Sequence, residues 1–142
     1  MIEAAGILLV EPSRQSVFLV RRSPLVSEPG TWANPGGVVE SGEHPMDAAI
    51  RETDEETGLH VPRLVGTPPS FKIDASNASR DLHYTLYVVL LTPGQAKQVQ
   101  RLCRLNWESD AAAWFDMRAL PEPMHPGLLA SMPYVLSRVA GN

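Results

Sequence analysis

The sequence lacks several features that would direct the protein to particular compartments or partners. Its only cysteine is Cys103, so no disulfide can form within the chain, and a reducing compartment suits it. Basic residues are not in excess: 12 Lys and Arg face 16 Asp and Glu, and the net charge of -4 argues against binding to nucleic acid polymers. The apolar run near the N-terminus is too short to span a membrane, and no basic lead-in marks a signal peptide. We therefore expect a cytoplasmic protein with no membrane partner.

What is present is ordinary for a globular protein. The 142 residues are 44% hydrophobic and 20% charged, with no internal repeat and no low-complexity segment. A chain of this length is long enough to bury a sizeable core. We predict one domain over residues 1–142; its oligomeric state is left open, a homodimer included.

Local patterns predict an α/β protein. Apolar and β-branched runs predict strands over Ile2–Val10, Ser16–Arg21, His60–Lys72 (broken by its prolines), Leu82–Thr92 and Ala112–Phe115. We expect Leu82–Thr92 to be the most buried, central strand. Helical spacing predicts a long helix over Pro45–Thr57 and a second over Pro126–Ala140, where Pro133 should shift the start or kink the helix.

The segment Pro45–Thr57 has clear helix boundaries. Pro45 suits the first helical position, where its missing N–H is not needed, and Gly58 suits the left-handed residue that closes a helix. At about 100° per residue, one stripe carries the side chains expected in the core, which are Met46, Ala49, Ile50 and Thr53. The hydroxyl of Thr53 needs a partner there, such as a carbonyl one turn back.

A second stripe of the same helix is acidic. Glu52, Glu55 and Glu56 lie at i, i+3 and i+4, where like charges destabilise a helix by a few tenths of a kcal/mol per pair. A hard divalent cation held by oxygen ligands would neutralise them. The alternative is a solvated charged face, which is what we expect for Asp54. Before the helix, the loop from Gly36 to Glu43 contains glycines that let the backbone approach a ligand closely.

The spacing of these residues resembles the signature of the Nudix hydrolases. That signature is Gly, five residues, Glu, seven residues, then Arg-Glu-aliphatic-any-Glu-Glu-any-Gly-aliphatic. The chain matches it from Gly37 through Glu43 to Arg51–Leu59, except that Thr53 stands at an aliphatic position. The resemblance implies an α/β/α sandwich, with a mixed β-sheet between helices.

The resemblance also implies a reaction and a cofactor. Nudix enzymes of the MutT type hydrolyse a pyrophosphate bond in a nucleoside diphosphate joined to another group, and they use Mg²⁺ or Mn²⁺. Carried over by position, the metal ligands are Glu52, Glu55, Glu56 and the backbone carbonyl of Gly37. Glu52 is also the first candidate for the general base, although some members place the base on a distant loop.

The resemblance assigns two further roles. Arg51 and Glu43 would pair, holding the loop against the helix and orienting Glu52. Some triphosphatases use an acidic residue six positions before a Trp that starts a strand. Glu108, six before Trp114, fits that position as a further metal ligand, with Asp110 as its rival and an exposed loop charge as the alternative.

The substrate is less well specified than the reaction. The region Ala75–Asn77 matches neither the ADP-ribose nor the dinucleoside-polyphosphate pattern. We therefore expect a nucleoside triphosphate, canonical or oxidised, with a nucleotide-sugar or ADP-ribose as the second choice. A nucleotide-binding module without catalysis is disfavoured, because such modules often lack one of the glutamates. A related diphosphate isomerase would need catalytic residues that this chain does not offer.

Overall fold

The sheet is organised around β1 (Ile2–Glu11), in a computed structural model that describes residues 1–67, 70–76 and 81–140. Along its whole length β1 pairs in parallel with β6 (Leu82–Leu90). Its other edge is shared by two antiparallel partners, β4 (Gly36–Val38) near its start and β2 (Ser16–Arg22) near its end. The point where β1 changes partner is therefore close to the glycines of β4.

The remaining strands extend this sheet on both sides. β5 (Ser70–Asp74) is antiparallel to β6, whereas β3 (Trp32–Ala33) and β7 (Ser109–Asp116) are both antiparallel to β2. The order of the main path is β3-β2-β1-β6-β5. A short 3-10 turn, Pro12–Arg14, joins β1 to β2, and the two strands form an antiparallel hairpin.

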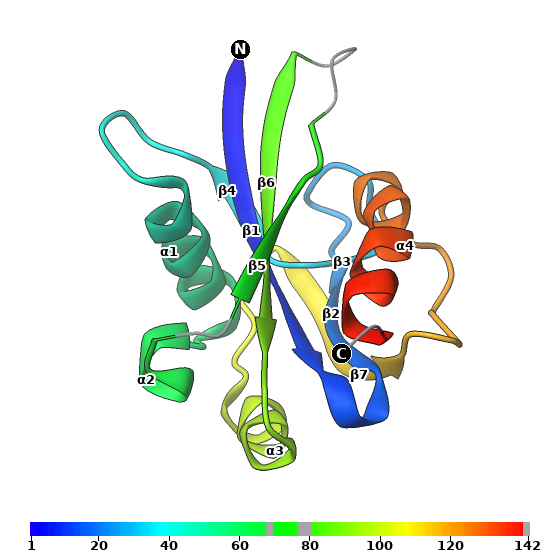
Figure 1. Cartoon of the computed structure of the whole chain (residues 1–142). Helices are drawn as coiled ribbons and strands as arrows, with labels where there is room; N and C mark the ends of the chain where they lie inside the picture. Colours follow the sequence, from blue (N-terminus) through cyan, green and yellow to red (C-terminus); the bar gives the residue numbers. More distant parts are fainter. Residues whose placement is uncertain (68–69, 77–80, 141–142) are drawn as a thin grey trace.

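Helices cover both faces of the sheet (Figure 1). On one face lie α1 (Pro45–Thr57), α2 (Val61–Val65) and α3 (Pro93–Leu102), and on the other lies α4 (Pro126–Ala140). Because side chains alternate along a strand, β1 serves both cores: Ile7 packs on the α1 side and Leu8 on the α4 side. The α/β/α sandwich with a mixed sheet is confirmed.

Helix α1 begins and ends where the sequence predicts. Pro45 is in its first turn, and Gly58 caps it with φ of 71°. Thr53 is only 1% exposed, and its hydroxyl donates to the carbonyl of Ala49 at 2.7 Å, one turn back as expected. The threonine at the aliphatic position is thus accommodated within the helix itself.

Two of the predicted strands are different in the structure. The central, most buried strand is β1, whose residues 4–11 are all buried, whereas β6, which also has a neighbour on each edge, is buried only over residues 86–89. Residues 61–65 form α2 and not a strand, since Pro62 takes an early helical position where no N–H is required. Pro68, Pro69 and Asn77 lie outside the described residues.

Two further expectations need correction. Gly36–Val38 is a strand and not part of a loop, because it finds a partner in residues 4–6 of β1. Helix α4 runs without interruption from Pro126 through Pro133, so Pro133 does not shift its start.

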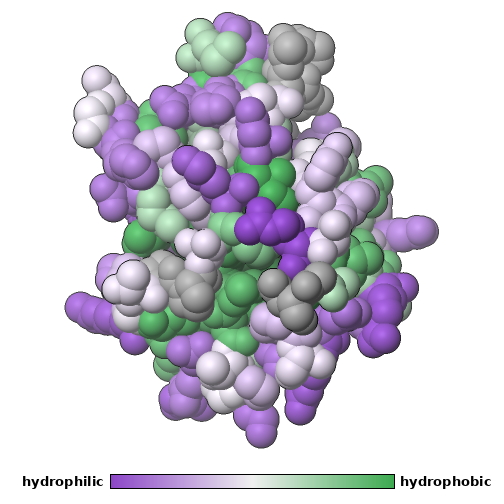
Figure 2. Space-filling view, in the orientation of Figure 1, coloured by the Kyte–Doolittle hydropathy of each residue, from purple (hydrophilic) through white to green (hydrophobic). Residues whose placement is uncertain are grey.

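The visible surface is mixed in character. Figure 2 shows hydrophobic areas interrupted by polar and charged residues over this face of the molecule. In the described parts of the chain, no helix combines the length and apolar character needed to cross a bilayer.

Replacing Thr53 with valine tests whether its hydroxyl matters to the fold. The substitution removes a helix-internal hydrogen bond and places a methyl group in an apolar site. We expect the free energy of unfolding to stay equal or to rise by up to about 1 kcal/mol, measured by urea denaturation. Thr53→Ser keeps the hydroxyl and deletes the methyl group, and it should cost about 1 kcal/mol. A loss above about 1 kcal/mol in Thr53→Val would show that the hydroxyl stabilises the helix.

Candidate active site

The acidic stripe of α1 faces the glycine strand β4. Glu56 lies at the buried end of this stripe, only 5% exposed, and its Oε2 accepts the N–H of Gly36 at 3.0 Å. Burial, followed by repulsion from Glu108, raises the pKa of Glu56 to about 8. A carboxylate is therefore held in a place where its negative charge is poorly solvated.

Glu52 requires glycine at position 37. A Cβ atom on Gly37 would lie 2.5 Å from the carboxyl carbon of Glu52, closer than atoms can pack. At Gly36 the obstacle is different, because a Cβ there would lie 2.7 Å from the carbonyl oxygen of Ala5 and 2.5 Å from the hydroxyl of Tyr84. Neither glycine has a positive φ, so both are needed for close approach and not for turning the chain.

Arg51 connects the helix to the segment that enters it. Its Nε donates to Oε2 of Glu43 at 2.9 Å, and its Nη2 donates to Oε1 at 3.1 Å. The same Nη2 donates to the carbonyl of Val38 at 3.2 Å, next to the glycines. The hydrogen bonds from Arg51 lower the pKa of Glu43. The expected pairing of Arg51 with Glu43 is present.

Arg51 also contacts the acidic stripe, which the sequence did not indicate. Its Nη1 lies 3.0 Å from Oε1 of Glu52 and 3.4 Å from Oε1 of Glu55. Burial raises the pKa of Glu52, and the guanidinium of Arg51 partly offsets this rise. With the longer ion pair to Glu40, at 3.8 Å, one arginine thus lies within 4 Å of four glutamates, whereas Glu56 accepts the N–H of Gly36.

The structure separates Glu108 from its rival Asp110. The negative charge of Glu108 contributes to the raised pKa of both Glu52 and Glu56, so it lies beside the acidic stripe. Asp110 instead accepts a hydrogen bond from Nε of Arg21 at 2.7 Å. Glu108 is therefore the residue that β7 and its preceding loop bring to the cluster.

A polar contact beneath β4 was not predicted from the sequence. Nδ2 of Asn34 donates to the hydroxyl of Tyr84 at 3.0 Å, and this hydroxyl lies where Gly6 and Gly36 have no side chain. Burial raises the pKa of Tyr84 to about 12, so the phenol stays protonated. Gly6 within an apolar strand is the available signal, because a glycine there often marks a close approach.

The chemistry of the cluster fits a hard divalent cation. Its donors are all carboxylate oxygens, and a cation beside Glu56 would reverse the unfavourable burial of charge. The side chains are not gathered as a ligand set, however: among the described residues, no three Asp, Glu, His or Cys side chains converge as they do around one ion. Glu52 and Glu55 contact Arg51 instead, and binding an ion would require them to exchange that contact.

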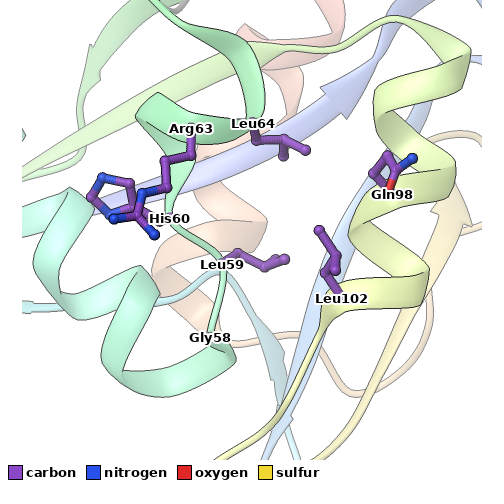
Figure 3. A pocket seen from close by; sticks show the side chains of 7 residues that line it. All are labelled: Gly58, Leu59, His60, Arg63, Leu64, Gln98 and Leu102. Atoms are coloured by element: carbon purple, nitrogen blue, oxygen red, sulfur yellow. The ribbon is translucent and has the colours of Figure 1, made fainter.

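A hollow lies away from the acidic stripe, at the C-terminal end of α1. It has a volume of about 360 Å³ and is formed between Gly58 and the helices α2 and α3. Figure 3 shows His60 and Arg63 on one side, with Gln98 and Leu102 on the other. Nδ1 of His60 lies 3.1 Å from Asp54, so Asp54 is ion-paired or hydrogen-bonded and not only solvated. None of the acidic stripe lines this pocket.

Comparison with known proteins gives consistent results. The family model described as NUDIX domain matches residues 2–135. "Putative 8-oxo-dGTP diphosphatase 3" of Mycobacterium tuberculosis is 32% identical over 132 residues, which cover 90% of this chain and 58% of that protein. An m7GpppN-mRNA hydrolase of Xenopus laevis is also 32% identical, over 81% of this chain and 42% of that protein.

A solved structure agrees with the fold. That of a Nudix hydrolase from M. smegmatis, RenU, has a TM-score of 0.73 and 25% identity, covering 98% of this chain and 86% of that one. The chain spans about half the length of the curated relatives it matches.

The two neighbouring glycines can be separated by substitution with alanine. In Gly37→Ala the new methyl group meets only the end of the Glu52 side chain, which can move. We expect stability to fall by less than about 1 kcal/mol while Glu52 is displaced from its position. In Gly36→Ala the methyl group meets the backbone of β1, so we expect a loss of about 2–4 kcal/mol. Thermal and urea unfolding measure both, and equal losses would contradict this assignment.

The buried Glu56 should make the stability of the metal-free protein depend on pH. The folded state raises the pKa from 4.5 to about 8, so it binds this proton more tightly than the unfolded chain does. The resulting stabilisation is complete below about pH 4.5 and is lost as the pH rises to about 8. In the presence of a chelator, the free energy of unfolding of the wild type should fall by on the order of a few kcal/mol over this pH range, and that of Glu56→Gln should not show this fall. Parallel stability curves for the two proteins would contradict the buried charge.

Proposed function

The chain belongs to the NUDIX domain family, and from this membership we propose that it hydrolyses a pyrophosphate bond in a nucleoside diphosphate linked to another group. The observation that carries the proposal is the packing of Glu52 and Glu56 against the glycines of β4, with the negative charge of Glu108 acting on both. Such a concentration of negative charge is unfavourable on its own. It becomes favourable when a divalent cation and its phosphate ligand are added.

The proposed metal ligands are the carboxylates of Glu52, Glu55 and Glu56 and the carbonyl of Gly37, with Glu108 as a further ligand. Bound Mg²⁺ or Mn²⁺ would neutralise charge on the phosphates and make a bound water more acidic. Gly37 has no side chain, and this leaves room for the carboxylate of Glu52 against the strand. The carboxylate of Glu56 is held in place by the hydrogen bond that it accepts from the N–H of Gly36.

The chain's own residues would handle the proton and the geometry. Glu52 is the proposed general base, which takes a proton from the attacking water. Its carboxylate is held from both sides, by the Cα of Gly37 and by Nη1 of Arg51 at 3.0 Å. Arg51 and Glu43 position Glu52 and do not touch the substrate, because their two hydrogen bonds hold the entering segment to α1.

A nucleoside triphosphate, canonical or oxidised, is the substrate that we propose. Its support is the similarity to a relative whose name specifies 8-oxo-dGTP, together with the lack of the ADP-ribose pattern after the helix. A relative of equal identity is named an m7GpppN-mRNA hydrolase, so the names of the relatives do not specify one substrate. A nucleotide-sugar or ADP-ribose is the second choice.

The deciding experiment is a substrate panel in Mg²⁺ or Mn²⁺, scored by release of phosphate and pyrophosphate. We expect turnover of nucleoside triphosphates above that of ADP-ribose and nucleotide sugars. Glu52→Gln should lower kcat by roughly 100-fold or more, because the water loses its base. The matched control is Asp54→Asn, an acidic residue of the same helix outside the cluster, which should retain activity.

Two outcomes would overturn parts of this proposal. A loss of only a few-fold in Glu52→Gln would remove Glu52 as the base and make Glu108 the next candidate. No turnover of any diphosphate by the wild-type protein would leave a nucleotide-binding module in place of an enzyme.

A further inference from the structure

Trp107 is exposed at the edge of the acidic cluster without an evident structural role. Its side chain is 63% exposed, whereas the other two tryptophans pack against aromatic rings, Trp114 on Phe18 and Trp32 on Phe115. Among the described residues, no ring contact involves Trp107. Single exposed apolar side chains are common on protein surfaces, so what distinguishes Trp107 is its place in the chain between Asn106 and Glu108.

The two residues beside Trp107 both connect to the cluster. The N–H of Asn106 donates to the carbonyl of Glu56 at 3.1 Å, and Glu108 acts electrostatically on Glu52 and Glu56. Neighbouring Cα atoms are about 3.8 Å apart, so the backbone of Trp107 lies within one residue of both contacts. The turn that carries Trp107 therefore adjoins the proposed diphosphate site, and its indole is exposed there.

The turn that carries Trp107 is fixed by hydrogen bonds. Oδ1 of Asn106 accepts the N–H of Glu108 at 2.9 Å, and Nδ2 of Asn106 donates to Oε1 of Glu108 at 3.1 Å. Just before it, the N–H of Arg104 donates to the carbonyl of Thr57 at 2.7 Å. An aromatic side chain on an ordered turn loses little freedom on binding a ligand.

A second exposed apolar side chain adjoins the same turn. The N–H of Ser23 donates to the carbonyl of Glu108 at 2.9 Å, and two residues further on Leu25 is 74% exposed. Two loops joined at the backbone of Glu108 thus each carry an exposed apolar side chain. A ligand that suits both parts has a polyanionic end and a flat apolar end, as a nucleotide has.

We propose that Trp107 stacks on the nucleobase of the substrate, an inference that rests on the proposed function of the acidic cluster. Stacking recognises the face of a base and not the hydrogen-bonding groups along its edge. Trp107 would thus bind nucleotides with different bases, purines more tightly because their rings are larger. It would contribute little to distinguishing oxidised from canonical guanine.

The test compares a substrate that has a base with one that lacks it. Trp107→Ala should raise KM for dGTP roughly 5- to 100-fold, the range expected for one base stacked on an aromatic side chain. Hydrolysis of inorganic tripolyphosphate should not change, and Trp107→Phe should recover most of the affinity. The ratio of kcat/KM for 8-oxo-dGTP to that for dGTP should stay within about 3-fold in both variants.

Tyr134→Ala is the matched control, because Tyr134 is an aromatic residue of similar exposure, 66%, on α4 across the sheet. It should behave as the wild type. An unchanged KM for dGTP in Trp107→Ala would overturn the proposal, and so would an equal loss on tripolyphosphate, which would mean a disturbed loop. Loss of a concentration-dependent dimer in Trp107→Ala with kinetics intact would identify a second copy of the chain as the occupant.

Binding without turnover separates this inference from the proposed function. A non-hydrolysable α,β-imido analogue of dGTP should change the tryptophan fluorescence of the wild type, and Trp107→Phe should lose that change. This result can be obtained even if the wild type hydrolyses nothing. Equal fluorescence changes in the two proteins would show that the base does not contact Trp107.

Discussion

The site depends on the close packing of β4 between β1 and the acidic face of α1. On one side, Gly36 pairs with Gly6 of β1, leaving no space for a side chain on either residue. On the other side, the carboxylates of Glu52 and Glu56 contact this strand directly, one against the Cα of Gly37 and one on the N–H of Gly36. Charged groups are thus placed directly against the sheet, and the two glycines of β4 are what allow it.

Local order in the sequence is enough to predict α1 and its boundaries. Its boundaries at Pro45 and Gly58, and the back-bonded hydroxyl of Thr53, depend on contacts within a few residues. The spacing of the glutamates relative to Gly37 likewise lies within one continuous segment, and the pairing of Arg51 with Glu43 followed from the family pattern. The sandwich architecture also came from that resemblance, since helical and strand patterns alone indicate only the α/β class.

Features that depend on distant partners could not be predicted in this way. Gly36–Val38 has the composition of a loop, and it becomes a strand because residues 4–6 lie beside it. The position of β1 at the centre follows from its having β2 and β4 on one edge and β6 on the other, which no single segment reveals. The resemblance already placed Glu108 ahead of Asp110, but the partner of Asp110 could not be predicted, because Arg21 of β2 is distant from it in the sequence.

The parallel pairing of β1 with β6 has a consequence for the order in which the protein folds. Ile2 pairs with Leu82, so the two central strands are separated by most of the chain, whereas α1 and β4 are neighbours in sequence. Closing such a long loop costs conformational entropy before any contact compensates for it, and proteins rich in distant contacts fold slowly. Glu108 comes later still along the chain and reaches the cluster only when β7 joins β2. The full set of carboxylates is therefore assembled only in the completed fold, and a partly folded chain carries the helix without the site.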